Sequence, residues 1–307
     1  MDTPIFIVGL PRSGSTLWSH VIAKNPSVFE IGEMLMLTPP WRRDFRYFLR
    51  VVMGGLPDDQ HIRRMVDLMF SGSKTPGITG SFWQYTANDY DHPELKQIIC
   101  TKIQTSDRTI GSVFRAFIEE LSAYQGYDRC SVKFPVFVNH VPDLLEWYPD
   151  CKIVHATRDP RAMAVSRANF RGQRRLKNHQ LTVLFAILQY VWTSQLHRRF
   201  STLPNYKLVH YEDLLVEPKR SVRELCDFAE IDFVARMLEP VEGQASSVTG
   251  TASGGFNRKA GTHWMGVISP LERRLVTTLT RPSMRRFGYD PEHHPIYLEN
   301  QAELRPA

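Results

Sequence analysis

A turn bracketed by two glycines near the start of the chain has the residues to bind a phosphate. Residues 4–16 read PIFIVGLPRSGST, an apolar β-branched run followed by the turn and by the start of a helical pattern. Free N–H groups and the helix dipole converge at such a junction. Gly9 and Gly14 have the spacing of a phosphate loop, but Ser15 replaces its lysine and Arg12 is the only full positive charge. We therefore expect phosphate binding without the lysine and metal scheme of an ATPase.

A second anion signature follows the apolar run of residues 151–157. Arg158 comes directly after this run, where ligands of open α/β sheets collect, and Ser166 lies about two helical turns further on. Both side chains could reach one anion from the same side. The alternative is that Arg158 pairs with Asp159 or caps the helix. Two phosphate sites at neighbouring strand ends suit a nucleotide that carries phosphate at both its 5′ and 3′ positions.

Strand and helix patterns alternate along the chain, which is typical of a parallel-sheet α/β domain. The sequence predicts strands at residues 5–9, 97–103, 130–134, 151–157 and 206–211. It predicts helices from residue 16 and over 109–123, 139–147, 161–169, 181–200 and 219–228. We expect one P-loop-like domain over residues 1–307, a central parallel sheet flanked by helices, with residues 34–96 as an acceptor-side insertion and 243–262 as a mobile loop.

Composition and cysteine spacing exclude several classes. The formal net charge of +6 fits an anionic ligand, but no zinc-finger, RNP or basic-helix pattern supports nucleic-acid binding. The four cysteines form no C-x-x-C pair, which argues against a metal site and a disulfide framework. No apolar run reaches the roughly 18 residues of a membrane span, and the first strand begins too early for a signal peptide. We expect a cytoplasmic protein without a bound metal.

The two anion motifs together resemble those of sulfotransferases that use 3′-phosphoadenosine 5′-phosphosulfate (PAPS). Residues 11–16 match the 5′-phosphosulfate loop of that family, and Arg158 with Ser166 matches its 3′-phosphate motif. The pattern is most similar to the tyrosylprotein-type branch and related bacterial enzymes. The weaker matches that support this branch are Gly32-Glu33, Cys130-Ser131-Val132-Lys133, Val209-His210-Tyr211-Glu212, Trp264-Met265-Gly266 and Phe287-Gly288-Tyr289-Asp290-Pro291.

The resemblance implies a role for each matching residue. Glu33 is the candidate base that takes the acceptor proton, and Lys133 is the lysine that faces the bridging oxygen and the sulfonate. The residues expected to bind PAPS, or its product PAP, are Arg12, Ser13, Gly14, Ser15, Thr16, Arg158, Ser166, Tyr211, Arg258 and Lys259. The family needs no metal. The cytosolic branch carries a catalytic histidine after its lysine, but Phe134 follows here; His20, His140 and His155 are the alternative bases.

The sequence indicates the chemical class of the acceptor less clearly than that of the donor. Glu33 is followed by Met-Leu-Met-Leu over residues 34–37, which favours a small or apolar acceptor with a hydroxyl or an amine. Arg42 and Arg43 could instead serve an acidic peptide, so that sulfation of a peptide tyrosine is an alternative. A P-loop nucleotide kinase or ATPase, or a non-catalytic nucleotide-binding protein, is the alternative from another class. The sequence does not predict an oligomeric state.

Overall fold

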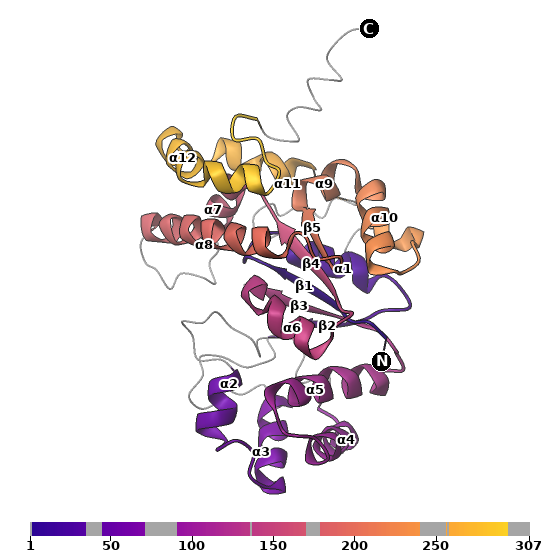
Figure 1. Cartoon of the computed structure of the whole chain (residues 1–307). Helices are drawn as coiled ribbons and strands as arrows, with labels where there is room; N and C mark the ends of the chain where they lie inside the picture. Colours follow the sequence, from indigo (N-terminus) through magenta and orange to yellow (C-terminus); the bar gives the residue numbers. More distant parts are fainter. Residues whose placement is uncertain are drawn as a thin grey trace. The chain divides into compact units, whose positions relative to one another are not determined.

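The computed structural model describes residues 2–34, 45–70, 91–135, 137–169, 179–239, 256 and 258–293. Five parallel strands form one sheet in the order β2-β3-β1-β4-β5 (Figure 1). The strands are β1 (Ile5–Gly9), β2 (Phe29–Glu33), β3 (Cys130–Pro135), β4 (Lys152–Thr157) and β5 (Tyr206–His210). Every residue of β1 is buried, as expected of a strand inside a parallel sheet. The predicted α/β fold with a central parallel sheet flanked by helices is confirmed.

The chain divides into two compact units, and the division passes through strands β1 and β4. Unit 1 contains Met1–Val8 and Ile22–Ile153, and unit 2 contains Gly9–Val21 and Val154–Ala307.

Unit 1 joins β2 and β3 to a group of helices. These helices are α2 (Phe45–Tyr47), the π-helix η1 (Phe48–Val52), α3 (Asp59–Phe70), α4 (Pro93–Gln104), α5 (Ile110–Tyr124), the 3-10 helix η3 (Phe137–His140) and α6 (Val141–Trp147). Thr109 caps α5 by accepting a hydrogen bond from the Ser112 N–H. The core includes the mutually packed rings of Phe6, Phe114 and Phe134. These aromatic contacts join β1 and β3 to α5.

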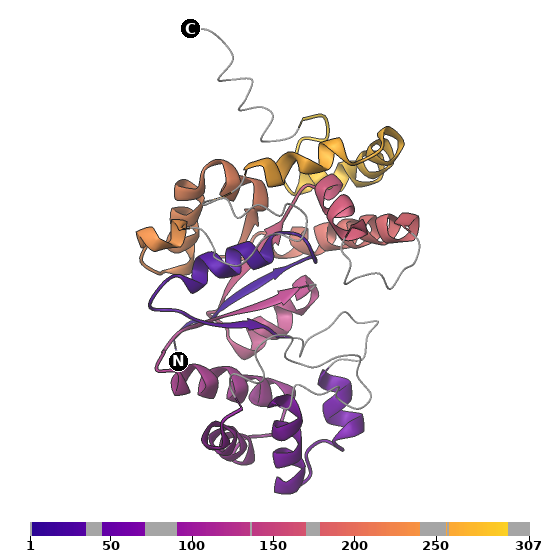
Figure 2. The same cartoon turned by 180° about the vertical axis from the view of Figure 1, so that it is seen from behind.

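Unit 2 holds most of α1 (Ser15–Ala23) and the C-terminal half of the chain. Its other elements are α7 (Pro160–Ala168), α8 (His179–Phe200), α9 (Tyr211–Val216), α10 (Pro218–Ala229), η5 (Ala235–Leu238), α11 (Arg258–Thr262), η6 (His263–Gly266) and α12 (Pro270–Arg286). Helices α7, α8 and α12 pack together through a cluster that includes Ala164, Val183, Ile187 and Val276 (Figures 1 and 2). Tyr289, which follows α12, packs in a second cluster.

Two predicted elements need correction. Residues 97–103, predicted as a strand, lie within helix α4. Leu95, Ile99 and Ile103 recur every four residues and are buried, so the apolar residues follow a helical period, and Pro93 stands in the first turn, where proline suits a helix. Strand β2 was not predicted, because its sequence FEIGE is short and only Ile31 is fully buried.

The insertion and loop predictions rest partly on residues outside the described ranges. The described portion of residues 34–96 contains α2, η1, α3 and the start of α4. Most of residues 243–262 lie outside the description, and within this segment α11 is helical. The single domain, the acceptor-side insertion and the mobile loop therefore stay predictions.

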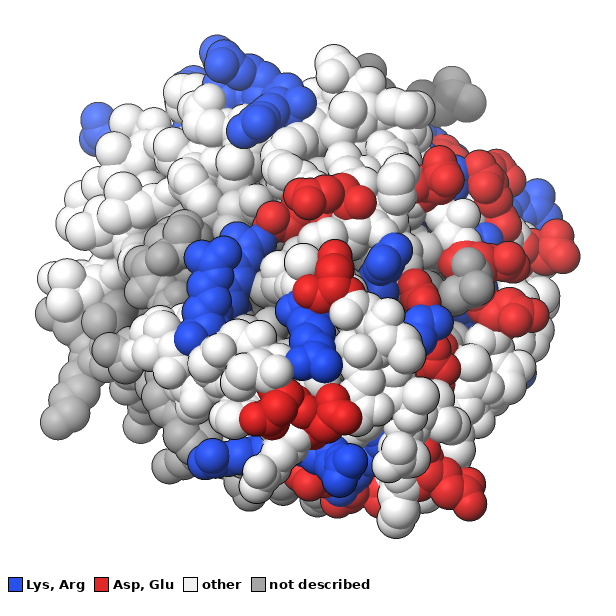
Figure 3. Space-filling model, turned by 60° about the horizontal axis from the view of Figure 1, so that its bottom comes forward, with Lys and Arg blue, Asp and Glu red and all other residues white. Residues whose placement is uncertain are grey.

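The described residues also bear on the predictions about cysteines, metals and membrane spans. All four cysteines are buried and free. No described helix has the length and apolarity to cross a membrane, and no metal-type cluster of His, Cys, Asp or Glu occurs among these same residues. On the face seen in Figure 3, basic and acidic side chains are interspersed. That face therefore shows no single-sign surface of the kind that nucleic-acid binding would favour.

Candidate active site

The predicted phosphate loop is built by the turn from β1 into α1. Gly14 has φ +91°, and a Cβ added there would lie 2.5 Å from the Cδ2 atom of Tyr211. Glycine is therefore required at this position by both the backbone and the neighbouring ring. Arg12 has φ +74°, a conformation that is uncommon for a residue with a side chain. Such backbone strain is typical of binding and catalytic loops.

Arg12 extends from this loop to α7, on which Ser166 lies. The Arg12 Nε–H donates to the Ser166 hydroxyl oxygen at 2.9 Å, so the structure joins the two motifs that the sequence predicted separately. Burial lowers the pKa of Arg12, and the positive charge of Arg158 lowers it further. Two like charges in one partly buried region repel each other. An anion between them would relieve that repulsion.

Arg158 lies just beyond the end of β4, as the sequence predicted. Its guanidinium carbon lies 4.2 Å from the centroid of the Tyr211 ring, and its Nη2 donates to the Ala260 carbonyl at 2.9 Å. The Nε of Arg158 is buried and has no hydrogen-bond partner among the described residues, and the same is true of the Ser13 hydroxyl. Because buried polar groups are nearly always hydrogen-bonded, these two orphaned groups favour a ligand with acceptor oxygens.

Asp159 pairs with Arg161 and caps helix α7 through its carboxylate. Its carboxylate accepts from Arg161, with Nη2 and Oδ2 2.6 Å apart, and it caps α7 by accepting from the Arg161 backbone N–H. Both side chains of this pair are almost completely buried.

Glu212 is a buried carboxylic acid whose role the sequence analysis did not identify. Its Oε1 accepts from the Asp159 backbone N–H at 3.0 Å, and its Oε2 accepts from the Tyr289 hydroxyl at 2.7 Å. Burial raises the pKa of Glu212, and the nearby Asp159 raises it further. Glu212 thus fixes the backbone directly after Arg158. The one available signal was its position beside Tyr211, at the end of β5.

Glu33 and Lys133 meet in unit 1, on the paired strands β2 and β3. The two residues are partners in the parallel register, and their side chains form an ion pair with Nζ and Oε2 2.7 Å apart. The Lys133 side chain is 9% exposed and that of Glu33 15%. A register shift between Glu30 and Gly32 separates Glu33 from Glu30, its near neighbour in the sequence. The carboxylate and the ammonium group therefore lie together in a largely buried setting.

The remaining predicted nucleotide-binding residues lie in helices α1 and α11 of unit 2. Ser15 is buried at the start of α1, where Thr16 follows it. Arg258 and Lys259 are exposed on α11, and the Arg258 Nη2 donates to the Val216 carbonyl. The backbone of Ala260, in the same short helix, accepts from Arg158. Helix α11 thus reaches Arg158 by its main chain, while the Arg258 side chain contacts Val216.

Two of the three histidines considered as alternative bases are committed to other partners. His140 is buried, and its Nδ1 bonds to the Asp143 carboxylate at 2.8 Å. His155 is buried, and its Nδ1 bonds to the Tyr206 hydroxyl. Burial lowers the pKa of His155 well below its usual range, which disfavours the protonated form that a base must reach. His20, in the last turn of α1, is partly exposed.

Comparison with known proteins identifies the family. Residues 4–235 match the sulfotransferase family, so the chain belongs to it. Protein-tyrosine sulfotransferase 1 of Danio rerio is 24% identical over 100% of this chain and 80% of its own length. An uncharacterized protein of Aquifex aeolicus is 23% identical over 77% of this chain, which spans only 26% of that longer protein.

Two solved structures share the fold. The sulfotransferase domain of the Synechococcus PCC 7002 olefin synthase aligns with TM-score 0.55 and 20% identity, over 94% of this chain and 95% of that domain. The sulfotransferase domain from the curacin biosynthetic pathway aligns with TM-score 0.57 and 18% identity, over 94% and 99%. The chain is thus a member of the sulfotransferase family with the sulfotransferase fold, which supports sulfonyl transfer as its general activity.

Proposed function

We propose that this chain transfers a sulfonyl group from PAPS to a hydroxyl or amine of a small or apolar acceptor. The observation that carries the proposal is the convergence of Arg12 and Arg158 on a glycine turn that lacks the ATPase lysine. Two buried donors that have no partner among the described residues, the Arg158 Nε–H and the Ser13 hydroxyl, occur in the same unit. A bis-phosphorylated nucleotide has enough acceptor oxygens for all of these groups.

The residues present fit such a nucleotide. Arg12, with the hydroxyls and backbone N–H groups of residues 13–16, would hold the 5′ phosphosulfate. Arg158 and Ser166 would hold the 3′ phosphate, and Tyr211 would contact the nucleotide beside Arg158. Arg258 and Lys259 would join the 3′ phosphate by turning their exposed side chains from α11.

The reaction needs a proton acceptor and a cation. PAPS supplies an activated sulfonyl group whose leaving group is a phosphate. Glu33 would take the proton of the acceptor hydroxyl as the new oxygen–sulfur bond forms and the bond from sulfur to the leaving phosphate oxygen breaks. Lys133 holds the Glu33 carboxylate by the 2.7 Å ion pair and would neutralise charge on the moving group. The product PAP, which carries the leaving 5′ phosphate, then dissociates.

The acceptor assignment rests on the apolar residues after Glu33. Met34 is fully buried, while residues 35–37 lie outside the described ranges. A peptide tyrosine is the second candidate acceptor, favoured by the similarity of the whole chain to a protein-tyrosine sulfotransferase. The proposal also places the enzyme in the cytoplasm, because four free and buried cysteines fit a reducing compartment.

A turnover assay tests the proposal. The purified protein is incubated with PAPS and a mixed library of phenols, aliphatic alcohols, amines and tyrosine peptides, and products are identified by mass spectrometry. We expect sulfonylated products that depend on PAPS and that are lost in the Arg158→Ala variant. Thermal-shift measurements compare PAP with ATP, and we expect stabilisation by PAP. Stabilisation by ATP with magnesium but not by PAP would contradict the proposal and favour a kinase or ATPase.

A further inference from the structure

Helix α8 of unit 2 has large apolar side chains on its outer face. Leu181, Leu184, Phe185 and Leu188 are between 41% and 58% exposed, and their spacing places them on one side of the helix. The opposite side packs into the unit through residues such as Ile187. A helix that is apolar on both sides is normally covered on both sides. The outer side of α8 is therefore a candidate interaction surface.

Helix α12 continues this surface. Leu271, Leu275 and Leu279 recur every four residues and are 79%, 49% and 45% exposed. Contiguous apolar patches beyond a few hundred Å² are rare on monomeric proteins and mark interaction sites. We call these three residues, with the four apolar residues of α8, the leucine face.

The two rows lie on the same side of the seam between the helices. The helices run side by side in the same direction, because His179 bonds to Glu272 near both starts and Ser194 bonds to Ser283 near both ends (Figures 1 and 2). The seam contains Val183, Ile187 and Val276. Leu184 and Leu188 each follow a seam residue, whereas Leu275 precedes one. When two neighbouring helices run in parallel, the residue after a seam residue on one helix and the residue before a seam residue on the other point to the same side of the pair.

The charged residues of the helices that carry the leucine face are almost all basic. Helices α8 and α12 together contain seven arginines and one acidic residue, Glu272, which bonds to His179. Arg274 and Arg285 are exposed, and they fall on a stripe about 100° around α12 from the leucines. A second copy of this chain on the same face would bring these arginines together. The charge therefore favours an anionic partner.

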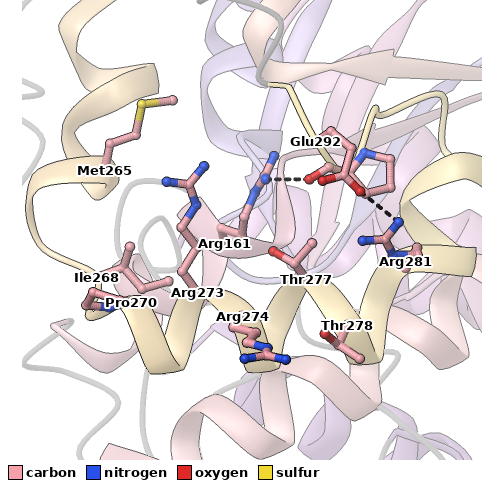
Figure 4. A pocket seen from close by; sticks show the side chains of 11 residues that line it. Arg161, Met265, Ile268, Pro270, Arg273, Arg274, Thr277, Thr278, Arg281 and Glu292 are labelled. Carbon is pink, nitrogen blue, oxygen red and sulfur yellow. Dashed lines mark hydrogen bonds and ion pairs between the residues drawn. The ribbon is translucent and has the colours of Figure 1, made fainter.

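A basic cavity lies on the arginine side of α12. It has a volume of about 570 Å³ and is lined by eleven residues, including Arg161, Arg273, Arg274 and Arg281 (Figure 4). Arg281 pairs with Glu292 at 2.7 Å, and Arg161 pairs with Asp159. Arg273 and Arg274 form no ion pair within the described part of the chain. The helix thus has an apolar stripe, and beside it a cavity with two uncompensated arginines.

We propose that the leucine face docks on the surface of a lipid bilayer that contains anionic lipids. Leucine and phenylalanine side chains enter the boundary between headgroups and acyl chains, while Arg274 and Arg285 contact lipid phosphates. The negative surface potential of an anionic leaflet attracts such exposed arginines. The helices lie on the surface and do not span it. This attachment is independent of the proposed sulfonyl transfer.

Vesicle sedimentation of the full-length protein tests this attachment. The vesicles are phosphatidylcholine alone or phosphatidylcholine with 30% phosphatidylglycerol, on the order of the charge of an anionic leaflet. We expect at least fivefold more binding to the anionic vesicles, and a marked decrease at high salt. The Leu188→Gln/Leu275→Gln variant should lose at least fivefold. The matched control, Val51→Gln/Ile98→Gln, changes two similarly exposed apolar residues of unit 1 and should bind like the wild type.

Three measurements separate the other outcomes. Circular dichroism checks that each variant is folded. The Arg274→Gln/Arg285→Gln variant, which leaves the leucines intact, should weaken binding and reduce its salt dependence. Equal binding by wild type and leucine variant, or equal binding to both kinds of vesicle, overturns the proposal. Light scattering that shows a wild-type dimer, converted to a monomer by the leucine substitutions and without vesicle binding, overturns it in favour of a second copy.

Discussion

Replacing Glu212 by alanine should destabilise the protein and weaken nucleotide binding together. The side chain is completely buried and accepts two hydrogen bonds, from the Asp159 backbone N–H and the Tyr289 hydroxyl. Each buried donor left without a partner costs about 1–3 kcal/mol, so the free energy of unfolding should fall by roughly 2–6 kcal/mol. The backbone after Arg158 loses its support, and we expect the affinity for PAP to fall about tenfold or more.

Glutamine at position 212 should be far milder, and its effect should depend on pH. The amide keeps the shape and an acceptor oxygen for the Asp159 N–H. Because the folded-state pKa of Glu212 is raised, its protonated form is favoured by folding. The protonated side chain therefore contributes to the free energy of unfolding in full below the unfolded-state pKa near 4.5, and this contribution is lost as pH rises through the folded-state pKa. The Glu212→Gln variant should therefore gain stability relative to the wild type as pH rises above about 4.5.

Urea unfolding at several pH values and calorimetric titration of PAP measure these effects. Glu224→Ala is the matched control, because Glu224 pairs with Arg220 on an exposed part of α10, and its removal should change stability by less than about 0.5 kcal/mol. Glu212→Ala with the stability and PAP affinity of the wild type would refute the idea that this carboxylic acid supports the Arg158 segment.

Three further predictions follow from the site and the core. Arg158→Ala should lower PAP affinity about tenfold or more by calorimetry, the loss of a charge-assisted contact worth roughly 1.5–3 kcal/mol, and unchanged affinity would remove the 3′-phosphate assignment. Glu33→Gln should bind PAP yet transfer sulfonate about 10²–10⁴-fold more slowly. Near-normal single-turnover rates in this variant would show that Glu33 is not the base and would favour a histidine instead. Burial lowers the pKa of His155, and lowers that of His197 to about 4, so thermal stability should fall as pH decreases from about 6.5 toward 4. A melting temperature that does not change with pH across that interval would contradict this, and so would an equally strong pH dependence in the His197→Gln variant.

The phosphate loop and the strand ends were predictable because their signals are local. An apolar run, a glycine turn and a helix start are contiguous in the sequence, so β1, the loop and α1 follow from one short segment. The same holds for β4, Arg158 and α7. Helix α4 was mistaken for a strand because Ile98, Ile99 and Cys100 form a short apolar run, whose helical period appears only when Leu95 and Ile103 are included.

The partners within each site could not be predicted, because they depend on contacts distant in the sequence. Glu33 and Lys133 were each proposed singly, and their ion pair exists only through the register of β2 on β3. The hydrogen bond from Arg12 to Ser166 needs the loop to approach α7. Glu212 gave only the signal of its position beside Tyr211, since an acidic residue at a strand end is usually exposed. Its hydrogen bonds with Asp159 and Tyr289 join segments that are distant in the sequence.

Tyr211 links the two halves of the proposed nucleotide site. Its ring closes against the backbone at Gly14, and the guanidinium of Arg158 lies over the same ring. Any shift of the ring that follows binding at the loop must also displace Arg158. The two phosphate sites should therefore respond to a ligand jointly. We expect a nucleotide with a single phosphate to have less than half of the binding free energy of PAP. Two separate monophosphates, one at each site, should each raise the affinity of the other.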